Sequence, residues 1–93
     1  MTLKIETTAD GRAATIRLIG RIDVQYLPEL EAQVSKHRPR LVLDLDELTL
    51  VDVAVVRFFE RCEAAGIELA NCAAYIREWM DRERDLERRL ETR

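Results

Sequence analysis

The sequence contains no long apolar run, and none of its apolar stretches approaches the roughly 20 residues that a helix needs to span a bilayer. Its first twelve residues also lack the apolar core of a secretory leader, so we expect a cytoplasmic protein without direct membrane insertion. With 93 residues the chain has room for one small domain. Its net charge of −3 gives no general reason to bind nucleic acid, which is not an expected partner.

Residues that carry metal or redox chemistry are scarce. There are two cysteines, Cys62 and Cys72, and one histidine, His37. A structural zinc site needs four ligands of this kind, so we expect two reduced, partly buried thiols and no metal site. The sequence also lacks a nucleophile beside a base, a glycine-rich phosphate loop and a pair of histidines. We therefore expect no catalytic residue, no cofactor and no enzyme activity.

The most informative stretch, residues 41–62, reads as a strand, a tight turn and a helix. Four of the six residues 41–46 are aliphatic, which indicates a central strand covered on both faces. After a turn at residues 47–49, Asp52 is placed to cap a helix, because its carboxylate can accept hydrogen bonds from the free amides of the first turn. Apolar residues then recur at helical spacing, at Val55, Phe58, Phe59 and Cys62.

The segments before this stretch are two strands and a helix. Residues 3–8 and 13–19 alternate apolar and polar side chains, and the Asp-Gly pair within residues 9–12 favours a hairpin between them. Asp23 can cap the next helix, whose regular part is predicted to begin near Tyr26. Residues 36–40, four of which are basic, then form a connector. It is either a solvated loop or a small patch that binds an anion or nucleic acid, and the solvated loop is favoured.

The segments after residue 62 are a short strand at residues 67–72 and a helix at residues 73–91 without glycine or proline. The predicted order is β-β-α-β-α-β-α. Because β-α-β crossovers are right-handed, this order predicts an α/β fold with a four-stranded mixed sheet and three helices.

The last helix is too long for the domain that precedes it. At 1.5 Å per residue it measures about 28 Å, whereas a strand of five or six residues spans about 17–20 Å. We therefore divide the chain into a domain at residues 1–80 and a charged helical extension at residues 81–93. Leu86 and Leu90 form a sparse apolar stripe on this extension. A frayed tail and a contact with a partner or a second copy, which would make a homodimer, both remain open.

Short motifs in order along residues 3–80 resemble the STAS domain, named for sulfate transporters and anti-sigma factor antagonists. They are Gly20-Arg21-Ile22-Asp23, Leu41-Val42-Leu43-Asp44-Leu45, Asp52, and Gly66-Ile67-Glu68-Leu69. The resemblance implies a small STAS-like fold. It also implies a non-catalytic regulatory module of a bacterial signalling pathway, which binds an anti-sigma factor, a sensor kinase or a larger complex.

The sequence departs from the STAS pattern directly after Asp52. The family has Ser, Ser, Gly and Leu there, and this chain has Val53, Ala54, Val55 and Val56. In anti-sigma factor antagonists a kinase phosphorylates the second serine and so switches binding off. Ala54 has no hydroxyl group, so this switch is absent or replaced.

An apolar helix start is either buried by its own fold or covered by another protein, since contiguous exposed apolar patches usually mark contacts. We predict a docking corner without hydroxyl groups. Its partner-binding residues are Asp23, Asp52, Val53, Ala54, Val55 and Phe58. Two other functions are open: an accessory subunit that docks on a membrane transport complex from the cytoplasm, and a STAS-like module that binds a nucleotide or another small ligand.

Five carboxylates are a further candidate site near the strand ends: Asp23, Asp44, Asp46, Glu47 and Asp52. Converging carboxylates bind Mg²⁺ or transfer protons. Helix caps and a turn explain four of them, however. Asp44 interrupts a strand, and we expect it to accept hydrogen bonds from backbone or side-chain groups.

Overall fold

The computed structural model describes residues 3–9, 11–37 and 40–91. In chain order the elements are β1 (Lys4–Ala9), β2 (Ala14–Arg21), the 3₁₀ turn η1 (Val24–Tyr26), α1 (Leu27–His37), β3 (Leu41–Asp44), β4 (Leu48–Leu50), α2 (Val53–Ala64), β5 (Glu68–Ala70) and α3 (Ala74–Glu91). The predicted α/β class, the mixed sheet and the three helices are confirmed. Of the predicted hairpin turn, Asp10 lies outside the described residues.

The predicted strand count was wrong, because the described residues form a sheet of five strands and not four. The turn expected at residues 47–49 is confined to Asp46 and Glu47, and the chain then returns to the sheet as β4. β3 pairs with the first half of β2, whereas β4 pairs with the end of β2 at Gly20 and Arg21. The sequence suggests a turn there because Asp46 and Glu47 are charged, and both are exposed in the structure. Leu48, which follows them, is buried in the core.

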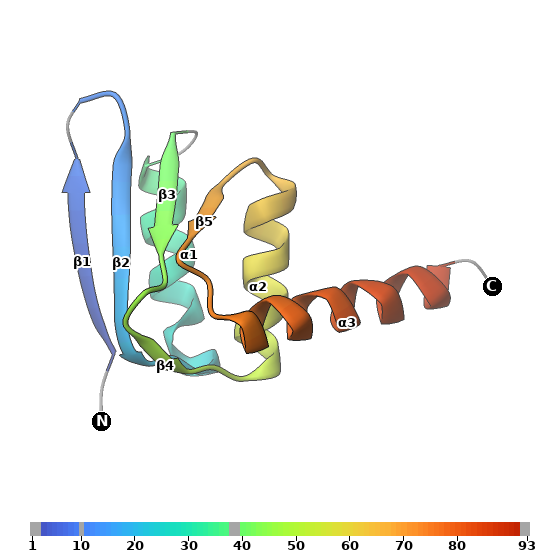
Figure 1. Ribbon diagram of the computed structural model, residues 1–93. Coiled ribbons are helices and arrows are strands. Elements are labelled where there is room, and N and C mark those ends of the chain that lie inside the picture. The colour runs from blue at the N-terminus through green and yellow to red at the C-terminus, as the bar shows by residue number, and fades with distance from the viewer. Residues whose placement is uncertain (1–2, 10, 38–39, 92–93) are drawn as a thin grey trace.

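The main sheet has the order β1-β2-β3-β5, in which β1 is antiparallel to β2 and the other pairs are parallel. Figure 1 shows α1 and α2 on one face of this sheet. The strand residues on that face are buried: Ala14, Ile16, Leu18, Leu41 and Leu43. No described helix covers the other face, where Val42 and Asp44 are half-buried. The expectation that residues 41–46 form a strand covered on both faces is therefore confirmed for one face only, and the strand ends at Asp44.

Helix α3 leaves the domain halfway along its length. Ile76 and Met80 are fully buried, whereas Leu86 and Leu90 are 51% and 70% exposed. Figure 1 shows the far half of α3 projecting from the domain, which explains a longest dimension of 44 Å against 30 and 23 Å. The predicted overhang is confirmed, although the helix runs without a break through the predicted boundary at residue 80. Within the described residues, no helix has both the length and the apolar character needed to cross a membrane.

Candidate functional site around Asp52

The carboxylate of Asp52 joins two helix starts. Its Oδ1 accepts a hydrogen bond of 3.0 Å from the amide of Val55, which caps α2 as the sequence predicts. Its Oδ2 accepts a second bond of 3.0 Å from the amide of Val24, the first residue of η1. The second bond joins residues 28 positions apart, so the local sequence pattern does not reveal it. One side chain thus fixes the position of η1 against the start of α2.

Asp23 lies at the same corner and is also a cap. Its Oδ1 accepts a hydrogen bond of 3.0 Å from the amide of Gln25, so the predicted capping role is confirmed at the 3₁₀ turn that precedes α1. Next to it, the amide of Ile22 donates to the carbonyl of Leu50 at 2.9 Å. Between these segments lies a hollow of about 80 Å³, lined by Arg21, Ile22, Asp23, Leu50, Val51 and Asp52.

Three aliphatic side chains point outward around Asp52. Val24 is 55% exposed, Leu50 is 49% exposed and Val53 is 40% exposed. We call these three residues, together with Asp52, the Asp52 corner. Neither Val24 nor Leu50 is among the partner-binding residues predicted from the sequence. The signal for Val24 is its place directly after a capping residue, where a side chain tends to face solvent.

Two of the predicted surface residues are not on the surface. Val55 and Phe58 are 0% and 4% exposed and belong to the core, so the prediction that both contribute to a docking surface was wrong. Both lie on the buried stripe of α2, which also includes Phe59 and Cys62. Ala54 is half-buried beside Val53 at the helix start.

Two hydroxyl groups lie next to the corner, on residues outside the predicted docking segment. The Oγ1 of Thr49 donates to the carbonyl of Gly20 at 2.9 Å, and the hydroxyl of Tyr75 donates to the carbonyl of Thr49 at 3.2 Å. These bonds tie β4 to β2 and to the first turn of α3. They therefore fix the backbone that carries Leu50.

Two other carboxylates of the predicted acidic cluster, those of Asp44 and Glu47, interact with groups outside the Asp52 corner. The Oδ1 of Asp44 accepts hydrogen bonds of 3.1 Å from the side chain of Asn71 and from the amide of Asp46, which confirms its predicted role. These two bonds, the one from Asn71 above all, lower the pKa of Asp44. Glu47 forms an ion pair with Arg17 at 3.0 Å. In the described part of the chain, no three His, Cys, Asp or Glu side chains are arranged to hold a metal ion.

Neither cysteine forms a disulfide with another described residue, in agreement with the predicted reduced thiols. Cys62 is buried and Cys72 is half-buried, and burial raises the pKa of the Cys72 thiol.

At the other end of β2, a hollow of about 210 Å³ is lined partly by the basic side chains Arg12, Lys36, His37 and Arg40. Arg38 and Pro39 of the predicted basic connector lie outside the described residues.

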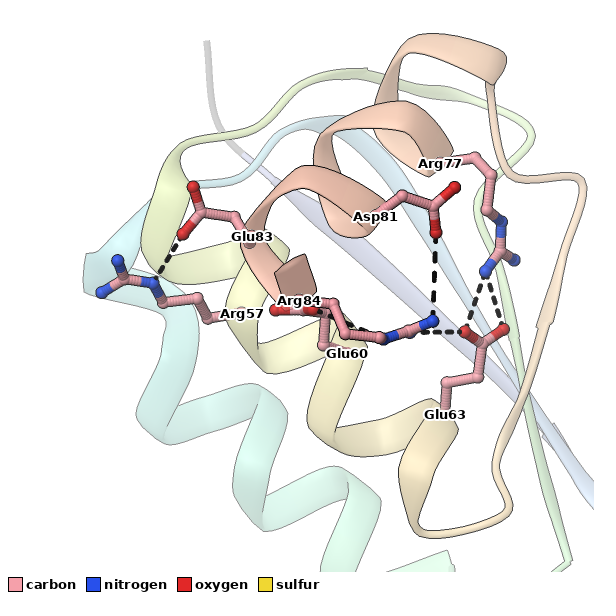
Figure 2. A network of polar contacts seen from close by, with 7 residues as sticks. All are labelled: Arg57, Glu60, Glu63, Arg77, Asp81, Glu83 and Arg84. Atoms are coloured by element: carbon pink, nitrogen blue, oxygen red, sulfur yellow. Dashed lines mark hydrogen bonds and ion pairs between the residues drawn. The ribbon is translucent and has the colours of Figure 1, made fainter. Parts of the chain in front are cut away.

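A network of ion pairs joins the second half of α2 to α3, and the sequence did not reveal it (Figure 2). One guanidinium nitrogen of Arg77 lies 2.8 and 2.9 Å from the two carboxylate oxygens of Glu63. Arg84 reaches Glu63 at 3.3 Å, Glu60 at 3.7 Å and Asp81 at 3.9 Å. A separate pair joins the Nε of Arg57 to Glu83 at 3.0 Å.

The two glutamates of α2 in this network have opposite pKa shifts. Burial raises the pKa of Glu60, the charge of Glu87 raises it further, and Arg84 offsets only part of the rise. One oxygen of Glu60 is buried without a hydrogen-bond partner among the described residues. Burial acts on Glu63 in the same direction, but hydrogen bonds from Arg77 and Arg84 outweigh it and lower the pKa of Glu63.

The chain matches no model of a known protein family, and it has no significant match among curated proteins.

Proposed function

We propose that this protein is a non-catalytic, STAS-like regulatory module that binds a partner protein through the Asp52 corner. The observation that carries the proposal is the grouping of Val24, Leu50 and Val53, each 40–55% exposed, around one carboxylate. Single exposed aliphatic residues are common on protein surfaces, whereas a contiguous group of them usually marks a contact site.

The backbone of the corner is held in place before any partner arrives. Asp52 accepts two backbone hydrogen bonds, and a further backbone bond joins Ile22 to Leu50. The bond from Thr49 to the carbonyl of Gly20 adds a fourth connection. A preorganised surface loses little conformational entropy on association, so more of the contact energy contributes to affinity.

One charged group at the corner, the guanidinium of Arg21, can pair with a carboxylate of the partner. Asp23 and Asp52 already accept hydrogen bonds from backbone amides. Arg21 lines the hollow, is exposed, and forms no ion pair with any described residue. An aliphatic side chain of the partner would cover Leu50 and Val53, and a neighbouring Asp or Glu would pair with Arg21.

The regulation of this binding differs from that of the serine-bearing antagonists that the chain resembles. Ala54 offers no phosphate acceptor at the second position of α2. The proposed control is the availability of the partner, an anti-sigma factor, a sensor kinase or a larger complex, or a ligand bound to either protein.

The test compares Val53→Asp with the matched change Leu90→Asp. Both replace an exposed aliphatic residue by a carboxylate. A carboxylate at position 53 is compatible with folding, because negative charge is favourable in the first turn of a helix. Proteins that wild type captures from cells encoding this chain are identified by quantitative mass spectrometry, and each is then purified for calorimetric titration.

The expected result is a partner that wild type and Leu90→Asp bind with equal affinity and that Val53→Asp binds at least about tenfold more weakly. If every captured protein binds all three variants equally, the Asp52 corner is not a docking site. The same conclusion follows if wild type captures no protein that Val53→Asp loses.

A further inference from the structure

One side of α3 carries a row of four apolar side chains. Tyr75, Leu86 and Leu90 are 46%, 51% and 70% exposed, and Trp79 is half-buried. Their spacings of four, seven and four residues place them in one narrow stripe along the helix. Ile76 and Met80, which are fully buried, lie on the adjoining side. The stripe therefore adjoins the face of α3 that packs on the domain. Trp79 packs against the core and the hydroxyl of Tyr75 donates to the carbonyl of Thr49, whereas Leu86 and Leu90 are exposed farther along the helix.

A line of four exposed charged residues runs along one flank of this stripe: Glu78, Arg82, Asp85 and Arg89. Their spacings of four, three and four residues keep them on the same flank, and their charges alternate in sign. When two antiparallel copies of a helix face each other, each flank meets the same flank in reverse order. Glu78 then lies opposite the partner's Arg89, and Arg82 lies opposite the partner's Asp85. The flank is its own electrostatic complement in this arrangement.

The shape of the helix surface agrees with this register. Arg82, Asp85, Leu86 and Arg89 surround a hollow of about 270 Å³. Residues spaced in this way form the four-residue hole into which a side chain of a facing helix inserts in coiled coils. In the register that the charges set, the partner's Arg82 lies over this hole. Its aliphatic stem fills the hollow, and its guanidinium group reaches Asp85.

We infer that this protein forms an antiparallel homodimer in which α3 of one copy lies along α3 of the other. The partner's Leu90 then lies between Tyr75 and Trp79, and the partner's Leu86 lies between Trp79 and Arg82. Because the pair has two-fold symmetry, each of these contacts between an aromatic residue and a leucine occurs twice in the dimer.

In this register residues 76–91 of the two helices overlap, so the contact runs along about 24 Å of helix, far more than two leucines at the tip would provide. A single helix pair is nevertheless at the small end of stable interfaces, so the expected Kd is on the order of 10–100 µM. The inference is independent of the proposed partner-binding function, because Val24, Leu50 and Val53 are not required for the pairing.

The first experiment is sedimentation equilibrium over a concentration series that spans this Kd. Wild type is expected to pass from monomer to dimer, and the double variant Leu86→Glu, Leu90→Glu is expected to remain monomeric. Val53→Asp, the variant that tests the Asp52 corner, is expected to dimerise like wild type. A monomeric wild type at every concentration overturns the inference, as does a double variant that dimerises normally.

The second experiment tests the register by exchanging charges. Arg82→Glu alone and Asp85→Arg alone each place like charges opposite each other twice, so each variant should dimerise roughly tenfold more weakly than wild type. An equimolar mixture of the two variants restores both attractive pairs, and it should form a heterodimer about as strong as the wild-type dimer.

Native mass spectrometry distinguishes the heterodimer by its mass, and circular dichroism checks that each variant keeps its helices. A parallel pair or a different register would give no rescue. A mixture that associates no better than its two components therefore overturns the antiparallel arrangement, even if wild type dimerises.

Discussion

The two halves of α2 are attached to the rest of the molecule by different physical means. At its start, one carboxylate accepts backbone hydrogen bonds from Val55 and Val24, and the surrounding side chains are apolar. In its second half, Glu60 and Glu63 form ion pairs with the arginines of α3 (Figure 2). The first attachment involves amide donors that do not titrate. The second attachment pairs charged side chains of α2 with charged side chains of α3.

This difference decides what each attachment can contribute. Ion pairs between partly exposed side chains are worth about 0–1 kcal/mol each and weaken in salt. Arg77 and Glu63 are 37% and 33% exposed, so their pair belongs to this class. Ile76 and Met80 are fully buried beside it. Burial of these two residues should therefore hold α3 on α2, whereas hydrogen bonds should hold the Asp52 corner.

The largest expected effect comes from Met80→Ala. Removing a fully buried methionine side chain should lower the free energy of unfolding by about 2–5 kcal/mol, measured by urea denaturation. The amide resonances of Val24 and Val55 should keep their chemical shifts, because the Asp52 corner does not depend on this side chain.

The control for Met80→Ala is Leu90→Ala on the same helix. Leu90 is 70% exposed, so its truncation should change the free energy of unfolding by no more than about 0.5 kcal/mol, measured in dilute protein where the monomer dominates. A loss below about 1 kcal/mol for Met80→Ala would show that the ion pairs, and not apolar burial, hold α3 in place.

The next effect in size is that of Asp52→Ala. It removes two hydrogen bonds from one carboxylate and should lower the free energy of unfolding by about 2 kcal/mol. Asp52→Asn keeps an oxygen that can accept the capping bond, so its loss should be smaller. Hydrogen exchange measures the two amides separately. If the amide of Val24 exchanges no faster in Asp52→Ala, the bond that joins η1 to α2 is not formed in solution.

The difference between local and long-range contacts explains which features could be predicted from the sequence. The caps at Asp23 and Asp52 were predicted because a cap depends on a carboxylate and amides two or three residues later. The bond from Val24 to Asp52 and the pairing of β4 with Gly20 depend on segments far apart in the chain. No local pattern encodes such contacts, so both became visible only in the folded molecule.

The error at Val55 and Phe58 has a different cause. Their spacing with Phe59 and Cys62 marks the buried stripe of an amphipathic helix, and the stripe is buried as this pattern implies. The resemblance to the STAS turn suggested a surface at the same positions. Periodicity was the better guide because it reflects the packing of this helix directly. The ion pairs between α2 and α3 were out of reach, since they depend on how the two helices are oriented.

The smallest expected effect is the difference between Glu60 and Glu63 of α2 in how their ionisation changes stability. The folded state lowers the pKa of Glu63 below its usual 4.5, so ionised Glu63 stabilises the fold above that pH, and this contribution is lost as the pH falls through the lowered pKa. The folded state raises the pKa of Glu60 above 4.5. The protonated form is therefore favoured in the fold, and its contribution is lost as the pH rises through the raised pKa.

At about pH 7, Glu63→Gln should thus lower the free energy of unfolding by about 0.5–1 kcal/mol, because Arg77 loses its charged acceptor. Glu60→Gln should raise it by up to about 0.5 kcal/mol, because the cost of burying a charge disappears while Arg84 keeps Glu63 as a partner. Urea denaturation of both variants and wild type, repeated below about pH 4, should show both differences shrinking. If both variants change the free energy of unfolding in the same direction at neutral pH, the two carboxylates do not have opposite effects on stability.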